Sequence, residues 1–120
     1  MKEKLIRLLE SFGFPVFLQG SLEPEIRYPD SFFTFWNNDT YDGSYYNNDT
    51  IAFIWSFDIN FYSTSPELVN TKLVEVRRLL RDNNFIVSGV GYDVGSDEIT
   101  HTGRGINALY IEYRRKNDVQ

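Results

Sequence analysis

The one histidine of the chain, His101, lies in the segment DEITHTGRG, which begins with two acidic residues, Asp97 and Glu98. A histidine that a carboxylate orients can act as a general base, so this segment could serve a small hydrolase or transferase. The chain has no cysteine, and no serine lies in a nucleophile-elbow motif. The tripeptides HTG and GRG are typical of turns. We therefore interpret the segment as a polar loop or strand edge, with catalysis at His101 as an alternative.

Motifs that bind cofactors are missing from the sequence. The segment GVGYDVG (residues 89–95) has the glycines of a phosphate-binding loop but not their spacing, and no GxGxxG, GxxxxGKS/T or HExxH motif occurs. The lack of cysteine excludes disulfides, thiolate zinc sites and iron–sulfur clusters. We accordingly expect a protein that is not an enzyme and that uses no cofactor.

The stretch NNDTYDGSYYNNDT (residues 37–50) has part of the spacing of a calcium-binding loop. When Gly43 takes the sixth position of such a loop, oxygen-bearing side chains fall at positions one, three, five and twelve. A calcium loop of this kind lies between helices, whereas both flanking segments here predict strands. We therefore keep a small ligand- or calcium-binding module only as the alternative function. Its candidate ligands are Asn38, Thr40, Asp42 and Asp49.

The same stretch also has features of a protein contact. Asn38 and Asn48 each begin an N-x-S/T glycosylation motif, which we interpret as coincidence because no secretory signal precedes them. Asparagine, aspartate and glycine suit a hairpin turn, but such a turn needs only about two to five residues. Because tyrosine is common at protein interfaces, we predict a contact loop. Its candidate interface residues are Tyr41, Asp42, Tyr45, Tyr46 and Asp49.

Composition and charge limit the class of protein. The 120 residues include 10 Phe, 8 Tyr and 2 Trp, which is enough apolar material for one folded domain spanning residues 1–120. The net charge is −5, and residues 21–62 alone hold seven acidic residues and one basic residue. An acidic chain is unsuited to neutralising the phosphates of duplex nucleic acid. With no apolar run of membrane-spanning length, we expect a soluble protein inside a cell, with no membrane partner.

Two amphipathic helices must cover the sheet that carries these segments. Leu5, Leu8, Leu9 and Phe12 recur at helical spacing, and Gly13 is placed to end that helix. The second helix is predicted from the capping residues 63–67 to about Asn83. Its apolar face is formed by Val69, Leu73, Val76 and Leu80.

The strands are predicted from alternating apolar residues. Residues 16–18 and 32–36 are short strand candidates, and residues 51–62 form the clearest one because every odd position from 51 to 61 is large and apolar. Residues 85–94 begin as a strand and break at their glycines. For the last strand, 106–114, we expect Asn107, Leu109, Ile111 and Tyr113 to face the core. The pattern predicts an α+β fold, with a mostly antiparallel sheet of about four to five strands and two helices on one face.

This order of elements resembles a known family. A tyrosine-rich loop leads into YYNNDTIAFIWSFDINFYSTSPELVN, a long strand that ends in a capped helix, and LLRDNNFIVSGVGYDVGSDEITHTGRGINALYIEY ends in the closing strand. The arrangement is similar to that of small tail-completion or tail-terminator proteins, which join head and tail in long-tailed, non-contractile phages and prophages. The resemblance covers residues 28 to 113 and rests on pattern and size.

The resemblance implies a structural role. Proteins of this family assemble, commonly as a hexameric ring, at the head-proximal end of the tail tube in the virion, after synthesis in the cytoplasm of the bacterial host. There the ring ends tube growth and joins the tail to the head connector or head-completion protein. The implied partners are other copies of the chain, the tail tube protein and the connector, and DNA passes through the lumen without specific binding. Another head-completion component of the same assembly is an alternative, and the family has no catalytic residues.

Overall fold

The computed structural model describes the backbone of residues 1–18, 29–45, 50–96 and 100–115, and the side chains of these residues outside 41–51 and 114–115. Two helices and six strands occur in these ranges. In chain order they are α1 (Lys2–Glu10), β1 (Val16–Leu18), β2 (Ser31–Tyr45), β3 (Thr50–Ser63), α2 (Pro66–Asp82), β4 (Ile86–Val87), β5 (Tyr92–Val94) and β6 (Thr102–Arg115).

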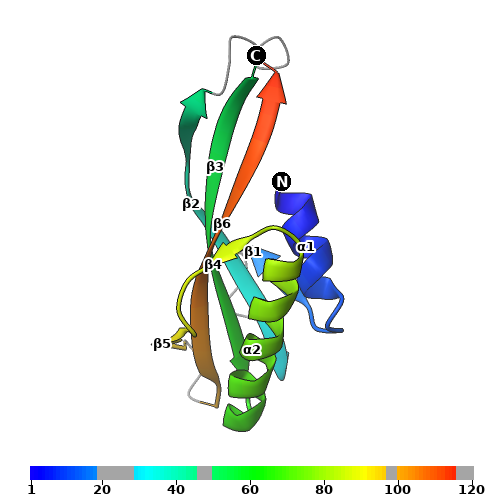
Figure 1. Cartoon of the computed structure of the whole chain (residues 1–120). Helices are drawn as coiled ribbons and strands as arrows, with labels where there is room; N and C mark the ends of the chain where they lie inside the picture. Colours follow the sequence, from blue (N-terminus) through cyan, green and yellow to red (C-terminus); the bar gives the residue numbers. More distant parts are fainter. Residues whose placement is uncertain (19–28, 46–49, 97–99, 116–120) are drawn as a thin grey trace.

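The strands form one sheet in the order β1-β2-β3-β6-β4, and β5 also pairs with β6 (Figure 1). β1 and β2 are parallel, and the other pairs are antiparallel. The predicted α+β class with a mostly antiparallel sheet is confirmed, but the predicted strand number is too low. The segment FIVSGVGYDV forms two short strands instead of one, because Gly89 and Gly91 between them adopt positive φ and turn the backbone.

Helix α2 forms as the sequence predicts. The Ser65 hydroxyl accepts a hydrogen bond from the backbone N–H of Leu68, and Pro66 lies in the first turn. The helix ends at Asp82, and Asn84 follows with a φ of 72°. The four residues of the predicted apolar face are all buried: Val69, Leu73, Val76 and Leu80.

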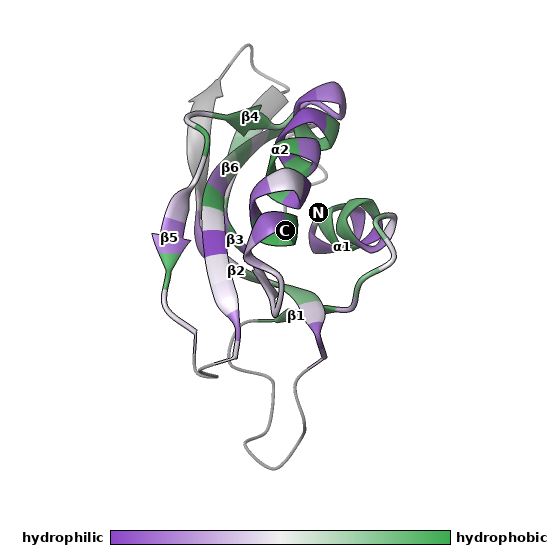
Figure 2. Cartoon of the chain, turned by 90° about the horizontal axis from the view of Figure 1, so that it is seen from below, coloured by the Kyte–Doolittle hydropathy of each residue, from purple (hydrophilic) through white to green (hydrophobic). Residues whose placement is uncertain are grey.

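Both helices lie on the same side of the sheet (Figure 2). Helix α2 contacts β3, β4 and β6, whereas α1 packs mainly on β1 and α2. Helix α1 buries Leu5 and Leu9, and the chain leaves it at Gly13, whose φ is 87°. Helix α2 therefore covers the centre of the sheet, and α1 extends that cover over one end of it.

Aromatic rings fill the space between the sheet and the helices. Three phenylalanines there, Phe33, Phe57 and Phe61, are fully buried, and the ring centroids of Phe33 and Phe61 are 4.7 Å apart. The odd positions of β3 point toward the helices from Phe57 to Phe61, as the alternation predicts. These rings bury large apolar areas in one place, which makes this layer the main source of stability.

The prediction for the core face of β6 is wrong. Phe57 pairs with Ala108 and Ile59 with Ile106, and paired residues in neighbouring strands share a face of the sheet. Ile106 and Ala108 are therefore the buried residues, with exposed fractions of 1 % and 0 %. The other face of β6, which carries Leu109, Ile111 and Tyr113, points away from the helices. Alternation alone could not choose between the two faces, because each of them carries apolar residues.

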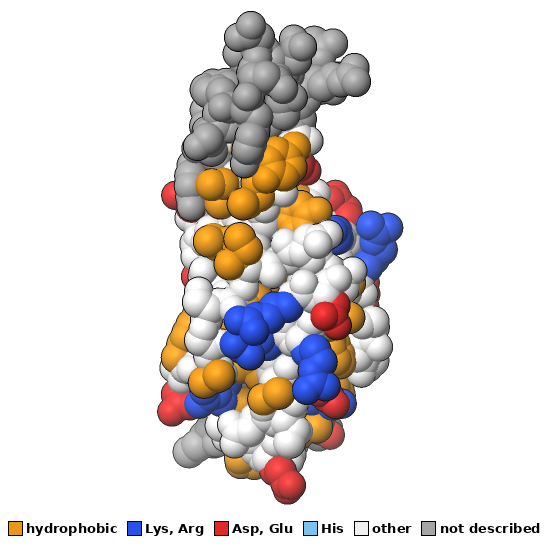
Figure 3. All heavy atoms as spheres, in the orientation of Figure 1, with side chains coloured by type: hydrophobic (Ala, Val, Ile, Leu, Met, Phe, Trp, Pro, Cys, Tyr) orange, Lys and Arg blue, Asp and Glu red, His pale blue; other side chains and the backbone are white. Residues whose placement is uncertain are grey.

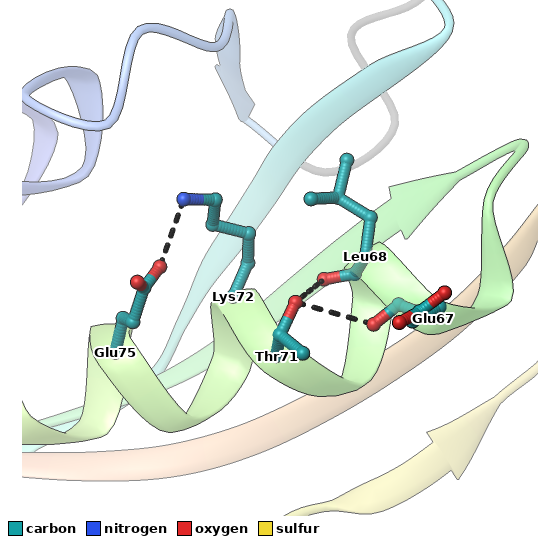
Figure 4. A network of polar contacts seen from close by, with 5 residues as sticks. All are labelled: Glu67, Leu68, Thr71, Lys72 and Glu75. Atoms are coloured by element: carbon teal, nitrogen blue, oxygen red, sulfur yellow. Dashed lines mark hydrogen bonds and ion pairs between the residues drawn. The ribbon is translucent and has the colours of Figure 1, made fainter.

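The exposed side of α2 is held by local polar contacts (Figure 4). Lys72 forms an ion pair of 2.8 Å with Glu75, three residues along the helix. The Thr71 hydroxyl is near the backbone oxygens of Glu67 and Leu68, at 3.2 and 3.3 Å. Such pairs contribute little stability on an exposed helix, so α2 depends on its buried face. In the described part of the chain, neither helix has the length and hydropathy needed to cross a membrane.

Replacing Leu73 by alanine should lower the free energy of unfolding by about 2–5 kcal/mol, because it leaves a cavity in the core. The neighbouring residue Val74 is 55 % exposed, so Val74→Ala should change the same quantity by less than about 1 kcal/mol. Urea denaturation followed by circular dichroism measures both variants. Equal losses for Leu73→Ala and Val74→Ala would contradict the assigned helix face.

Candidate functional site

Three strands extend beyond the layer that the helices cover. β3 pairs with β6 along its whole length, from Thr50 opposite Arg115 to Ser63 opposite Thr102, and it pairs with β2 on its other side. Figure 1 shows β2, β3 and β6 continuing past both helices as a narrow three-stranded projection. We define this projection, residues 41–45, 50–54 and 111–115, as the arm. It contributes to an elongated shape with principal extents of 53 × 29 × 22 Å.

The base of the arm is fixed to the core. Trp55 and Tyr110 pack against the core cluster from β3 and β6, and the rings of Trp55 and Phe57 are stacked at 7°. Lys4 of α1 donates a hydrogen bond of 3.1 Å to the Tyr110 hydroxyl and lies 4.5 Å from the centre of its ring. These contacts hold the start of α1 against β6 where the arm begins.

Both outer edges of the arm are unpaired in the described structure. β1 pairs only with residues Phe33–Phe35 of β2, and β4 pairs only with Ala108 and Leu109 of β6. Beyond these points, residues 36–45 of β2 and 110–115 of β6 have no further strand neighbour within the described ranges. Unpaired edges present backbone N–H and C=O groups that can pair with another strand.

The sheet face opposite the helices carries exposed apolar side chains. Trp36 pairs with Asp58, Tyr113 with Ala52, and Ile86 with Leu109, and this register places them on the face away from α2. The exposed fractions are 48 % for Trp36, 50 % for Ile86 and 56 % for Tyr113. Figure 3, which has the view of Figure 1 with both helices in sight, shows orange side chains next to the grey end of the arm on that side of the molecule as well. Apolar residues grouped in this way are typical of an interaction surface.

A band of polar residues crosses the same face below the arm. The Asn107 amide nitrogen is within 3.2 Å of Ser56 Oγ and Asp58 Oδ1. Two further residues in this band, Thr34 and Asn60, are each 7 % exposed, and within the described part of the chain Thr34 Oγ1 and Asn60 Oδ1 have no hydrogen-bond partner. Buried oxygens without partners cost stability. This polar band separates the apolar part of the face, next to the arm, from the aromatic part of the face at the other end of the sheet.

Tyr92 of β5 closes this band at its β6 side. A side chain at Gly105, its partner in β6, would meet both the Tyr92 ring and the Asn60 side chain, so glycine is needed there. Burial raises the pKa of the Tyr92 phenol, and the negative charge of Asp58 raises it further. Both effects favour the protonated phenol, the form in which the Tyr92 hydroxyl can act as a hydrogen-bond donor.

The predicted contact loop is mostly strand. β2 continues to Tyr45, so Tyr41, Asp42 and Tyr45 lie in the arm, where the structure describes their backbone. Tyr46 and Asp49 fall outside the described residues. The polar sequence does not end the strand, because β3 continues to pair with β2 and two bulges absorb the irregular residues, between Asn37 and Asp39 and between Asp42 and Tyr45.

The alternative interpretation of this stretch as a calcium-binding loop is not supported at residues 38–43, and Asp49, its remaining candidate ligand, lies outside the described residues. These residues belong to β2 and are extended instead of curved around a centre. At about 3.3 Å per residue, the backbone positions of Asn38 and Asp42 are about 13 Å apart, too far to share one ion. Among the described residues, no group of three or more histidine, cysteine or acidic side chains could hold a metal ion.

His101 joins the beginnings of two strands. Its Nε2 lies 2.8 Å from the carbonyl oxygen of Pro29, so Nε2 carries the proton and donates it. Its Nδ1 then accepts a hydrogen bond from the Thr100 hydroxyl, 3.0 Å away, and its ring packs edge-on against Phe32. This arrangement ties the residue before β6 to the chain entering β2. In this geometry the contacts of His101 are structural.

Comparison with known proteins adds no identity to this geometry. The chain matches no family model and no curated protein sequence.

The residues that sequence reasoning missed are Trp36, Ile86 and Tyr113. Each was interpreted as part of a strand, but none was recognised as exposed. The available signal was that β6 carries apolar residues on both faces over INALYIEY, since a strand with only one covered face needs them on one face alone.

The two tryptophans should differ in their accessibility to iodide. The variant Trp55→Phe keeps only Trp36, which is 48 % exposed, and its fluorescence should be strongly quenched. The variant Trp36→Phe keeps only Trp55, which packs against the core, and should be quenched less. Stern–Volmer titrations on dilute protein measure this difference. Equal quenching, or stronger quenching of Trp55, would show that the helix-free face is assigned incorrectly.

Proposed function

We propose that this chain is a structural subunit that assembles with copies of itself, and that the arm is the principal contact. The supporting observation is the combination of two strand edges that have no strand neighbour among the described residues with exposed apolar side chains on the helix-free face. An arm of three strands that projects beyond the core exposes backbone groups and apolar area together. Contact with a neighbouring protein pairs these backbone groups and buries the apolar area.

The two edges of the arm favour a ring over a symmetric dimer. One edge belongs to β2 and the other to β6, so a contact that joins them uses two different surfaces of the same chain. Such a head-to-tail contact leaves one free edge on each end of a growing assembly. Repetition by a constant rotation closes a ring in which every edge is paired.

We further propose that the ring completes the tail of a long-tailed, non-contractile phage or prophage, as the resemblance of the sequence implies. In this role the ring binds the head-proximal end of the tail tube, stops its growth and presents a surface to the head connector. The acidic segment 21–62 includes Asp39 and Asp58 of the helix-free side, and negative charge in the lumen would let DNA pass without binding. The resemblance supports this context, and the arm supports the assembly.

The chain should shorten tail tubes that grow in its presence. Tail tube protein of the phage or prophage that encodes the chain is polymerised with and without it, and tube lengths are measured by negative-stain electron microscopy. We expect shorter tubes, each with a ring on one end, because the bound ring blocks addition of further tube subunits. The double variant Ile111→Ser/Tyr113→Ser, on the helix-free side of the arm, should weaken this effect.

Val74→Ser is the matched control, because Val74 is similarly exposed at 55 % but lies on α2. Rings that leave tube length unchanged would overturn the tail-terminator assignment while leaving self-assembly intact. A chain that stays monomeric at millimolar concentration and also with tubes present would overturn both.

A further inference from the structure

Two arginines lie together on one side of the last turns of α2. Arg77 and Arg81 are four residues apart, so they occupy neighbouring turns on the same side of the helix. The groove between α2 and the end of α1 is lined by other residues of the helix, among them Glu75 and Asp82, and by neither of these arginines. Figure 3 shows Lys and Arg side chains gathered below the arm, on the side of the molecule where α2 lies.

The loop between β4 and β5 runs beside these arginines. The Arg81 guanidinium donates two hydrogen bonds, of 2.8 and 3.3 Å, to the carbonyl oxygen of Val87 at the start of the loop. At the other end of the loop, a side chain on Gly91 would come within 2.9 Å of Leu73 Cδ2, so the backbone there packs on α2. Because Arg77 is one turn after Leu73 and one turn before Arg81, it lies between the two points where loop and helix meet.

A third arginine and an apolar side chain border the same loop. Arg104 of β6 donates a hydrogen bond of 2.9 Å to Asp93 and lies 3.5 Å from the carbonyl oxygen of Val90. The Val90 side chain is 68 % exposed, more than any other large apolar residue of the described ranges. We define the arginine surface as Arg77, Arg81, Val90 and Arg104.

The positive charge of this surface is not balanced within the described part of the chain. Arg104 is paired with Asp93, but Arg77 and Arg81 make no ion pair there, and like charges four residues apart on a helix repel each other. The helix dipole favours a base in the last turn, which accounts for Arg81. Arg77 lies a turn earlier, and its buried Nε has no hydrogen-bond partner among the described residues. An anionic group bound at both guanidinium groups would offset their repulsion.

The surroundings of the arginines favour a carboxylate over a nucleic-acid phosphate. A guanidinium group binds either anion through paired N–H donors. The chain has a net charge of −5, which repels a nucleic acid, and exposed Val90 offers an apolar contact that a phosphate backbone does not use. Arginine beside exposed apolar area is typical of a contact with another protein.

We infer that the arginine surface binds an acidic segment of another protein, with carboxylates on Arg77 and Arg81 and an apolar side chain against Val90. This contact goes beyond the proposed self-assembly, because it uses neither the free edges of the arm nor the helix-free face. A single copy of the chain is therefore sufficient to bind such a segment.

The synthetic peptide Glu-Glu-Val-Glu-Glu-Val is a direct probe of this contact. It is titrated into dilute, isotope-labelled chain, and amide NMR spectra locate the residues that respond. We expect shifts at residues 77–91 and at Arg104. The variant Arg77→Glu should weaken binding about tenfold or more, because it places a negative charge against the carboxylates. Arg77→Lys keeps the charge but loses the paired donors, so it should weaken binding less than Arg77→Glu.

Arg7→Glu is the matched control, since Arg7 is exposed on α1 and the variant makes the same charge change outside the arginine surface. It should bind the peptide like the wild type, and thermal melts confirm that each variant is folded. An equal loss in Arg7→Glu and Arg77→Glu would show a general attraction between the chain and an acidic peptide, and would overturn the assigned surface.

Oligothymidylate of the same length tests the chemical class of the partner, because it offers phosphates in place of carboxylates. Binding as tight as that of the acidic peptide would overturn the assignment to a protein partner. A lack of shifts at residues 77–91 with the acidic peptide would overturn the contact altogether. Since these titrations use the unassembled chain, neither result bears on the proposed ring, whose failure is seen separately as a lack of self-association.

Discussion

The structure depends on the pairing of β3 with a strand on each side over its full length. Fourteen residues of β3, Thr50 to Ser63, are paired with β6, and β2 follows the other side with two bulges. The core covers only part of this length. From Phe57 to Phe61 the pairing is supported by buried rings, whereas the arm continues past both helices, with only the start of α1 beside its base. One continuous ladder therefore links a stable layer to a projecting one.

This division explains why the two parts of the chain suit different roles. The covered part has matched apolar faces on α2 and the sheet, and it specifies one fold through burial. The arm keeps its strand geometry because it continues a fixed register, although its tip is polar and its helix-free face is partly apolar. A second protein that covers an edge or face of the arm buries surface that this chain cannot bury itself.

Sequence patterns predicted the elements whose periodicity is tied to burial. The buried face of α2, its cap at Ser65 and the alternation of β3 are all confirmed, because one covered face leaves one regular pattern. The predictions fail where pairing with a neighbouring strand, and not the local sequence, determines the structure. Residues 37–45 are rich in asparagine, aspartate and glycine and predict a loop, yet β3 holds most of them in a strand. The core face of β6 was misassigned because the outer face is also apolar. The candidate interaction surface could be predicted only in part, since exposure of Trp36 and Tyr113 depends on the register between strands.

The central claim is that the free edges of the arm pair between copies of the chain. A cryo-electron microscopy map of the assembled protein, with tail tubes as template, tests it most directly. The account predicts a closed ring in which β6 of one copy lies beside β2 of the next. A ring whose copies touch only through α2, with both arm edges exposed to solvent, would contradict it.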